Sequence, residues 1–341
     1  MIKPFHVCFI AAIILLISCS KNAFRGKTTP HREYREALVK AGYDLVSWED
    51  WLALAKACEA HGVPALFRSD HYLNLGGELD LGSLDAWATL SALAAVTSTL
   101  RLGTLVSPAT FRHPSELAKV VATADHVSEG RVELGIGAGW LEPEHLAYGF
   151  PFPPVRERMD RLAEQIEIVH GSWTQAPFSF EGAHYRLDGL DAQPRPLQSP
   201  HPPLIMGGAA GPRSVALAAR WADEYNTPFA TLGQIKERMA KIREACEAAG
   251  REPIPFSLMT GFLVGRDREE LRERAVALHG DKADEFLASP PEEWIVGTVD
   301  EAVEQLGALR DAGLHRVMLQ HLLHTDLAAV ELIGRDLPRA I

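Results

Sequence analysis

The sequence has few cysteines, and none of them stands in a pattern that binds a metal or forms a redox pair. Four occur in 341 residues, and no two are spaced as a CxxC motif. Cys8 and Cys19 precede the part of the chain that we expect to fold, which leaves Cys58 and Cys246. A framework of disulfides is therefore not indicated.

Positive charge is also scarce. Lysine and arginine number 34 against 45 acidic residues, which gives a net charge of −11. A nucleic-acid surface needs clustered excess positive charge, so we expect no nucleic-acid partner. The motifs HExxH and GxSxG are absent, and the glycine-rich residues 207–211 lack the GK[ST] ending of a P-loop. His321 and His324 could face one metal ion, but hydrogen-bonded histidines are commoner, and we expect no metal site.

The unbroken apolar run of residues 7–17 is too short to cross a bilayer as a helix, but it has the length of a signal-peptide core. It ends in Leu16-Ile17-Ser18-Cys19, which resembles the lipobox of bacterial lipoproteins, and no acidic residue precedes Glu33. We therefore expect residues 1–32 to form a signal-like segment and linker that packs little against a domain of residues 33–341.

Two interpretations of this N-terminal segment stay open. A genuine lipobox would anchor the protein to a membrane through lipidated Cys19. The rest of the chain is typical of a soluble enzyme that uses a reduced cofactor, and a mis-assigned start codon or a gene fusion would explain the mismatch. We expect a cytoplasmic protein, with a membrane-anchored lipoprotein as the alternative.

From residue 47 onward, short apolar strands alternate with amphipathic helices. Ser47 and Gly62 mark the start and end of a helix, Pro114 opens another, and Thr298 with Glu301 forms a capping box. Helices are expected, among other places, at residues 84–99, 212–221, 232–249 and 269–279. Strands are expected at residues 64–68, 100–106, 132–136, 203–208, 222–227, 256–264 and 315–322.

Strands and helices that alternate about every thirty residues form parallel βαβ units. A further strand among residues 38–46 is doubtful, because residues 33–42 also suit a short charged helix. The seven clear strands, with or without it, allow a closed (β/α)8 TIM barrel or an open doubly wound sheet. We predict the α/β barrel. Residues 174–203 interrupt the alternation with six prolines and a short alternating run at 178–187, which predicts an excursion with a hairpin.

The stretch of residues 130–149 is the first candidate for a binding site. Its strand becomes glycine-rich at Gly135, Gly137 and Gly139, and missing side chains let a ligand or another backbone come close. Either this is the floor of a binding site, or it is a tight strand-to-helix turn whose polar residues face water. The polar and aromatic residues that follow the glycines are Trp140, Glu142, Glu144 and His145.

In a barrel of this kind the site lies at the carboxyl ends of the strands. Asp70 and His71 stand at such an end, and a histidine beside an acid suits proton transfer. A histidine that merely bonds the next loop would explain the pair equally. Residues 207–211 follow another strand and open a helix with Arg213 in its first turn, which suits a phosphate group.

Five segments together resemble the luciferase-like flavin- and deazaflavin-dependent oxidoreductases. The resemblance covers about residues 47–338 and depends on the order and spacing of motifs that are weak singly. It implies a (β/α)8 barrel with an insertion after the fourth strand, FMN or coenzyme F420 across the strand ends, a small-molecule substrate, and a homodimer. The segments are PALFRSDHY, RLGTLVSPATFRHPSELAKVVATADHVSEGRVELGIGAGW, EPEHLAYGF, PLIMGGAAGPRSVALAARWADEYN and HRVMLQHLL.

The resemblance also implies roles for individual residues. His71 and Asp70 match the family's acidic–histidine pair beside the reactive ring. The strand-3 bulge that supports the ring, often with a non-proline cis peptide, is matched by Leu105, Val106 and Ser107. The floor of the site on the fourth strand is matched by Gly137, Gly139 and Trp140. The phosphate grip is matched by Gly207, Gly208 and Arg213.

Two departures from the family pattern matter. Its sugar-phosphate dehydrogenases have a glutamate where Trp140 stands, so we do not expect that activity. The usual opening strand is degraded or replaced upstream of Ser47.

The segment FRSDHY is most similar to the F420-dependent subgroup, and the sequence therefore predicts F420-dependent hydride transfer to or from a small organic substrate. The alternatives are an FMNH2-dependent monooxygenase that uses O2 and a non-catalytic flavin-binding protein.

Overall fold

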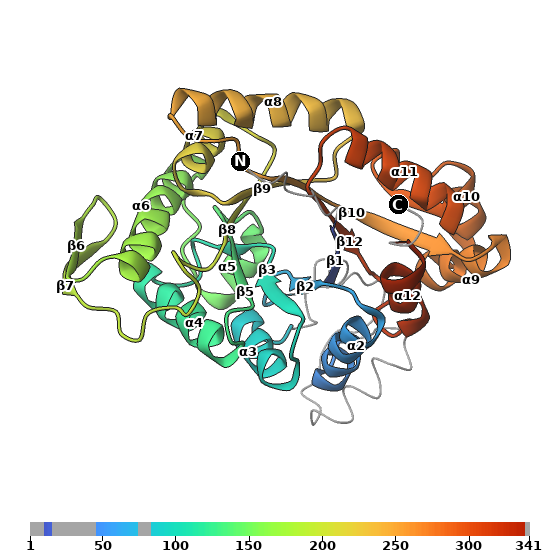
Figure 1. The fold of residues 1–341 in the computed structure, drawn as a ribbon, viewed down its shortest axis with the longest axis horizontal. Coiled ribbons are helices and arrows are strands. Elements are labelled where there is room, and N and C mark those ends of the chain that lie inside the picture. Colours follow the sequence, from blue (N-terminus) through green and yellow to red (C-terminus); the bar gives the residue numbers. More distant parts are fainter. Residues whose placement is uncertain (1–9, 16–45, 74–82, 338–341) are drawn as a thin grey trace, which may run out of the picture.

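The computed structural model describes residues 10–15, 46–73 and 83–337. Within these ranges, parallel strands pair side by side in a ring, and the pairing of β9 with β10 closes it (Figure 1). This arrangement confirms the predicted barrel class. The ring strands are β1 (Ile10–Leu15), β2 (Ala65–Arg68), β3 (Arg101–Thr104), β5 (Val132–Gly137), β8 (Leu204–Gly207), β9 (Glu224–Pro228), β10 (Phe256–Gly265) and β12 (Arg316–Gln320).

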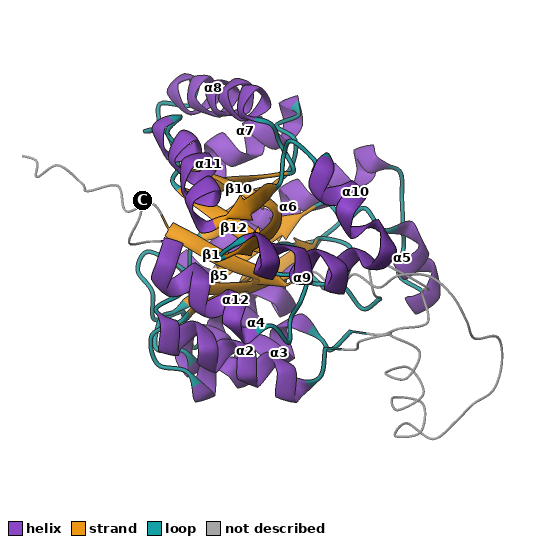
Figure 2. Cartoon of the chain, turned by 90° about the vertical axis from the view of Figure 1, so that its right-hand side faces the viewer, coloured by secondary structure: helices purple, strands orange, loops and turns teal. Residues whose placement is uncertain are grey.

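Helices surround the sheet, which occupies the centre of the molecule (Figure 2). Ser47 caps the start of α2, Gly62 ends that helix with φ +79°, and Thr298 with Glu301 caps α11, all as predicted. Asp50 completes a capping box with Ser47. None of the described helices is long and apolar enough to cross a membrane. The helices are α2 (Trp48–His61), α3 (Ala86–Val96), α4 (Pro114–Val127), α5 (Glu142–Tyr148), α6 (Val155–Thr174), α7 (Pro212–Trp221), α8 (Leu232–Ala248), α9 (Arg268–His279), α10 (Ala283–Ala288), α11 (Val299–Asp311) and α12 (Leu327–Glu331).

The first ring strand lies where we expected a signal-like segment. Strand β1 pairs with β12 along five positions and with β2 along three. The prediction that residues 1–32 pack little against the barrel is therefore wrong for residues 10–15. The physical reason is that a fully buried parallel strand is also an unbroken apolar run, so length and hydrophobicity did not separate the two. The doubtful strand at residues 38–46 lies outside the described residues except for Val46, which is buried.

The predicted excursion contains an antiparallel hairpin between α6 and β8. Its strands are β6 (Phe178–Glu181) and β7 (Arg186–Leu190). Glu164 of α6 accepts hydrogen bonds from the backbone N–H groups of Ala183, His184 and Tyr185 and so holds the hairpin turn. The hairpin follows the fourth ring strand, as the family resemblance implied. Two further short strands, β4 (Ser107–Pro108) and β11 (Ile295–Thr298), were not predicted as separate elements.

The interior of the ring is charged at the amino ends of the strands. The Arg316 guanidinium lies 2.9 Å from a carboxylate oxygen of Glu133 and 2.6 Å from one of Glu224. Burial alone would raise the pKa of Glu133, but Arg316 and Arg101 outweigh it and lower that pKa. An apolar layer of Ala65, Phe67, Leu105, Ile205 and Met318 packs within the ring as well. These paired charges fill the amino end of the ring, whereas the active sites of such barrels lie at the carboxyl ends of the strands.

Candidate active site at the carboxyl ends of the strands

A bulge follows β3, as the family resemblance implied. The peptide bond between Leu105 and Val106 is cis, although neither residue is a proline. Directly after it, Ser107 and Pro108 pair with Ile136 and Gly137 at the end of β5. The Leu105 N–H donates to the Arg68 carbonyl at the end of β2, 2.8 Å away. The bulge is therefore held between two neighbouring ring strands.

The glycines of the neighbouring strands make room for the Val106 side chain. A Cβ atom added at Gly137 would lie 2.8 Å from a methyl carbon of Val106, and one added at Gly207 would lie 3.2 Å from another. At Gly135 the Cβ would lie 2.0 Å from the Thr104 carbonyl oxygen and 3.0 Å from Val106. The missing side chains thus admit the bulge itself. The result is an apolar wall centred on Val106 across the ends of β5 and β8.

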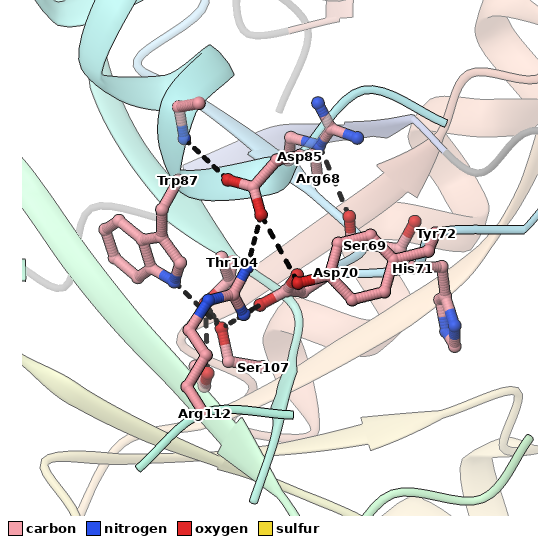
Figure 3. A network of polar contacts seen from close by, with 12 residues as sticks. Arg68, Ser69, Asp70, His71, Tyr72, Asp85, Trp87, Thr104, Ser107 and Arg112 are labelled. Atoms are coloured by element: carbon pink, nitrogen blue, oxygen red, sulfur yellow. Dashed lines mark hydrogen bonds and ion pairs between the residues drawn. The ribbon is translucent and has the colours of Figure 1, made fainter. Parts of the chain in front are cut away.

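The adjacent residues Asp70 and His71 point in different directions from the end of β2 (Figure 3). Asp70 is buried, and its Oδ2 atom accepts from the Ser107 hydroxyl at 2.7 Å and from the Arg112 guanidinium at 2.5 Å. The structure therefore does not bring the Asp70 carboxylate to the His71 ring. Asp70 instead joins the end of β2 to the bulge after β3.

Asp70 belongs to a larger buried network (Figure 3). Arg112 also donates to Asp85, the N-cap of α3, at 2.6 Å, and Trp87 donates its indole N–H to Ser107 at 3.0 Å. Burial opposes the charge of Arg112, but Asp70 and Asp85 outweigh it and raise the pKa of that guanidinium. The Ser107 side chain is thus directed into this network, so its backbone is the part of the residue left to support a cofactor.

His71 is held by a carboxylate that lies far away in the sequence. Its Nδ1 atom lies 2.8 Å from Glu144 Oε2, on α5. The Trp140 ring meets the imidazole edge-on, with 5.8 Å between ring centroids. No hydrogen-bond partner for His71 Nε2 occurs among the residues described, so this nitrogen is free to meet a ligand. Trp140 itself is 65% exposed.

The predicted phosphate grip is divided between a helix end and an arginine that points elsewhere. Helix α7 begins after Gly211 with Pro212 and has no side-chain cap, which leaves backbone N–H groups of its first turn for an anion. The Arg213 guanidinium lies against α6, 3.0 Å from the Arg156 carbonyl and 2.5 Å from an Asp160 oxygen. The amino end of α7 therefore remains a candidate phosphate site, whereas the Arg213 guanidinium is paired with the exposed Asp160 carboxylate.

Sequence reasoning missed two residues that organise this end of the barrel. Glu144 was noted only as one of several polar residues after a strand, and Arg112 was not singled out. Both follow the carboxyl end of a ring strand, where site residues of such barrels gather, and this position is the signal that could have drawn attention to them. Their partners, at positions 71, 70 and 85, could not be read from local spacing.

Comparison with known proteins gives three findings that bear on this site. A family profile described as luciferase-like monooxygenase matches residues 26–316. An F420-dependent glucose-6-phosphate dehydrogenase of Nakamurella multipartita is 31% identical over 317 residues, which is 84% of this chain and 91% of that protein. An FMNH2-dependent dimethylsulfone monooxygenase of Pseudomonas putida is 34% identical over 193 residues, 57% of this chain and 52% of that protein.

A solved structure supports the fold independently of these sequences. The crystal structure of the monooxygenase RslO1 from Streptomyces bottropensis superposes with a TM-score of 0.77 at 23% identity. The match covers 98% of this chain and 100% of that one. At this identity the likeness concerns the fold alone.

Proposed function

Because this chain belongs to the luciferase-like monooxygenase family, we propose that it is an oxidoreductase that uses coenzyme F420 for hydride transfer to or from a small organic substrate. The F420-dependent relative of Nakamurella multipartita matches 84% of this chain, whereas the FMNH2-dependent relatives of Pseudomonas putida and Pseudomonas fluorescens match 57% and 68% of it. The observation that carries the proposal is the place of Val106, whose side chain lies against Gly135, Gly137 and Gly207 and forms a wall for a flat ring.

The residues at this end of the barrel fit a flavin-type cofactor. Val106 and the backbone of the bulge would support one face of the ring, and Gly137, Gly139 and Trp140 would lie along its edge. The uncapped amino end of α7, next to Gly207 and Gly208, would hold a phosphate. Bound F420 supplies a ring carbon that takes up or gives back a hydride.

His71 is the residue that we assign to proton transfer. Imidazole is the side chain most often used as a general acid or base, and this one is buried, held at Nδ1 and free at Nε2 among the described residues. Asp70 supports the site through Ser107 and Arg112, and we do not assign it a direct step. Trp140 is a large apolar surface beside His71, so we propose a neutral organic substrate and not a sugar phosphate.

A second function, FMNH2-dependent oxygenation, is favoured by the dimethylsulfone monooxygenase relative. The two are separated by supplying the enzyme with reduced F420 and small aldehydes or ketones, with oxidised F420 and small alcohols, or with reduced FMN, O2 and the same organic compounds. Under nitrogen, F420-dependent hydride transfer predicts oxidation of the reduced deazaflavin by an aldehyde or ketone, or reduction of the oxidised deazaflavin by an alcohol. Oxygen uptake that requires FMNH2 and organic substrate, with no anaerobic turnover of F420, would overturn the proposal in favour of the monooxygenase.

Gly207→Asp is expected to weaken cofactor binding much more than it lowers stability. A carboxylate there would bring a negative charge close to the phosphate that we place at the start of α7, and placing like charges together costs on the order of several kcal/mol, so we expect Kd to rise by at least about tenfold. Because any Cβ would also press on Val106, Gly207→Ala serves as the steric control. Titration of both variants and a melting curve give the measurement. Unchanged affinity of Gly207→Asp for both F420 and FMN would place the phosphate elsewhere.

We also propose a cytoplasmic protein and, on the family resemblance, a homodimer. Cleavage before Cys19 would remove residues 10–15, which form a strand between β12 and β2. The intact mass of the native protein, together with its solution mass by light scattering, tests both points.

A further inference from the structure

The Glu144 carboxylate connects α5 to the end of β2 through both of its oxygens. It is fully buried. Oε2 lies 2.8 Å from His71 Nδ1. Oε1 accepts hydrogen bonds from two consecutive backbone N–H groups, those of Tyr72 and, at 2.9 Å, Leu73. Each oxygen therefore has its own partners, and the carboxylate cannot rotate without losing several hydrogen bonds.

We propose that Glu144 is a positioning residue that fixes the tautomer of His71, with the proton on Nδ1 and the lone pair on Nε2. The consequence for catalysis rests on the proposed function, but the hydrogen bonds that fix the tautomer do not depend on a cofactor. An ionised carboxylate only accepts hydrogen bonds, so the nitrogen that faces it must donate. In neutral imidazole the other nitrogen is then the proton acceptor.

The other charged and titratable groups nearby do not compete for His71. Asp70 binds Ser107 and Arg112 through Oδ2, and its buried Oδ1 has no hydrogen-bond partner among the described residues, His71 included. His145, on the same helix as Glu144, is bonded through Nε2 to the Thr110 hydroxyl at 2.6 Å and through Nδ1 to the Leu141 carbonyl at 2.7 Å. Glu142 is exposed. Glu144 is therefore the carboxylate that orients the ring.

This arrangement has a chemical consequence at Nε2. That nitrogen can take a proton from a substrate, and the imidazolium that forms stays beside the buried carboxylate that stabilises it. The edge-on contact with the Trp140 ring further restricts rotation of the His71 imidazole about its Cβ–Cγ bond. Glu144 thus acts through His71 and does not itself touch the substrate.

Glu144→Gln tests the proposal because it should reverse the tautomer without emptying the site. Tyr72 and Leu73 N–H both donate toward Oε1, so the amide oxygen is expected to take that place and the NH2 group to face His71. The NH2 group donates, so Nδ1 must then accept and the proton moves to Nε2. Nitrogen-15 NMR of histidine-labelled protein reads the tautomer directly, and His71→Gln identifies the His71 signals.

In the wild type we expect the His71 signals of a ring protonated at Nδ1, and in Glu144→Gln those of a ring protonated at Nε2. Turnover should fall by about 10²–10⁴-fold, as when a carboxylate that orients a catalytic histidine becomes an amide, with little change in cofactor Kd. Glu164→Gln is the matched control, since Glu164 also accepts several backbone N–H bonds but lies at the hairpin. It should leave the His71 signals and turnover unchanged.

A wild-type His71 ring protonated at Nε2 would overturn the proposal, and this measurement needs no variant to fold. A Glu144→Gln protein that keeps the wild-type tautomer and turns over within about threefold of the wild type would overturn it as well. If the tautomers reverse as expected while F420 gives no turnover in any variant, Glu144 keeps its positioning role and the proposed function fails separately.

Discussion

A protein that lacks residues 1–18 is expected not to fold into the barrel. The deletion removes β1, which pairs at five positions with β12 and at three with β2. If each paired position contributes one backbone hydrogen bond worth about 1 kcal/mol net, the loss is about 8 kcal/mol, close to the whole stability of a typical domain. The ring would also open, and two strand edges would be exposed to other chains. Circular dichroism, thermal unfolding and gel filtration provide the measurement.

Cys19→Ser is the matched control for this deletion. It removes the residue that a lipoprotein pathway would modify and leaves β1 in place, so it should melt with the wild-type midpoint. A truncated protein that remains monodisperse and melts like the wild type would contradict the assignment of residues 10–15 as a ring strand. That result would restore the interpretation of the segment as a removable leader.

His71→Ala is expected to lose at least about a hundredfold in turnover at saturating cofactor, because a positioned general acid or base contributes roughly 10²–10⁴-fold. Cofactor affinity should change little, since the phosphate and ring contacts that we assign lie after β3, at the ends of β5 and β8, and at the start of α7. Fluorescence titration followed by steady-state kinetics measures the two quantities on one preparation.

His126→Ala is the control, because His126 lies in the last turn of α4 and bonds the Arg195 carbonyl, at the end of the barrel away from the strand carboxyl ends. Its turnover should match the wild type. A loss of no more than about threefold in His71→Ala, with normal cofactor binding, would remove His71 from the mechanism.

Much of the fold could be predicted because its signals are local. The expected helix at residues 212–221 is α7. Ser47 and Thr298, each followed within three positions by an acidic residue, were predicted to cap helices, and both do. The first strand could not be predicted in this way, because residues 7–17 satisfy the pattern of a signal-peptide core and of a buried strand equally well. Its place is decided by β2 and β12, which pair with it from far along the chain.

The site shows the same division between local and distant information. The cis bulge at Leu105 and Val106 was expected from the family resemblance and is present. Asp70 and His71 were paired because they are adjacent in the sequence. Successive residues of an extended chain point to opposite sides, however, and this rule already argues against a contact between the two side chains. The true partner, Glu144, is 73 residues from His71 and has no local signature. The glycines of β5 likewise have no explanation in the local sequence. They make room for Val106, which approaches Gly135 and Gly137 only in the folded structure.

The central claim is that the carboxyl ends of these strands form an F420 site, and equilibrium titration of the full-length protein with F420 and with FMN tests it most directly. Both titrations are followed by fluorescence under the same conditions, with Gly207→Asp measured alongside to link the binding to the end of β8. We predict saturable F420 binding that is tighter than FMN binding and is weakened by at least about tenfold in Gly207→Asp. Tight binding of FMN without binding of F420 would contradict the account.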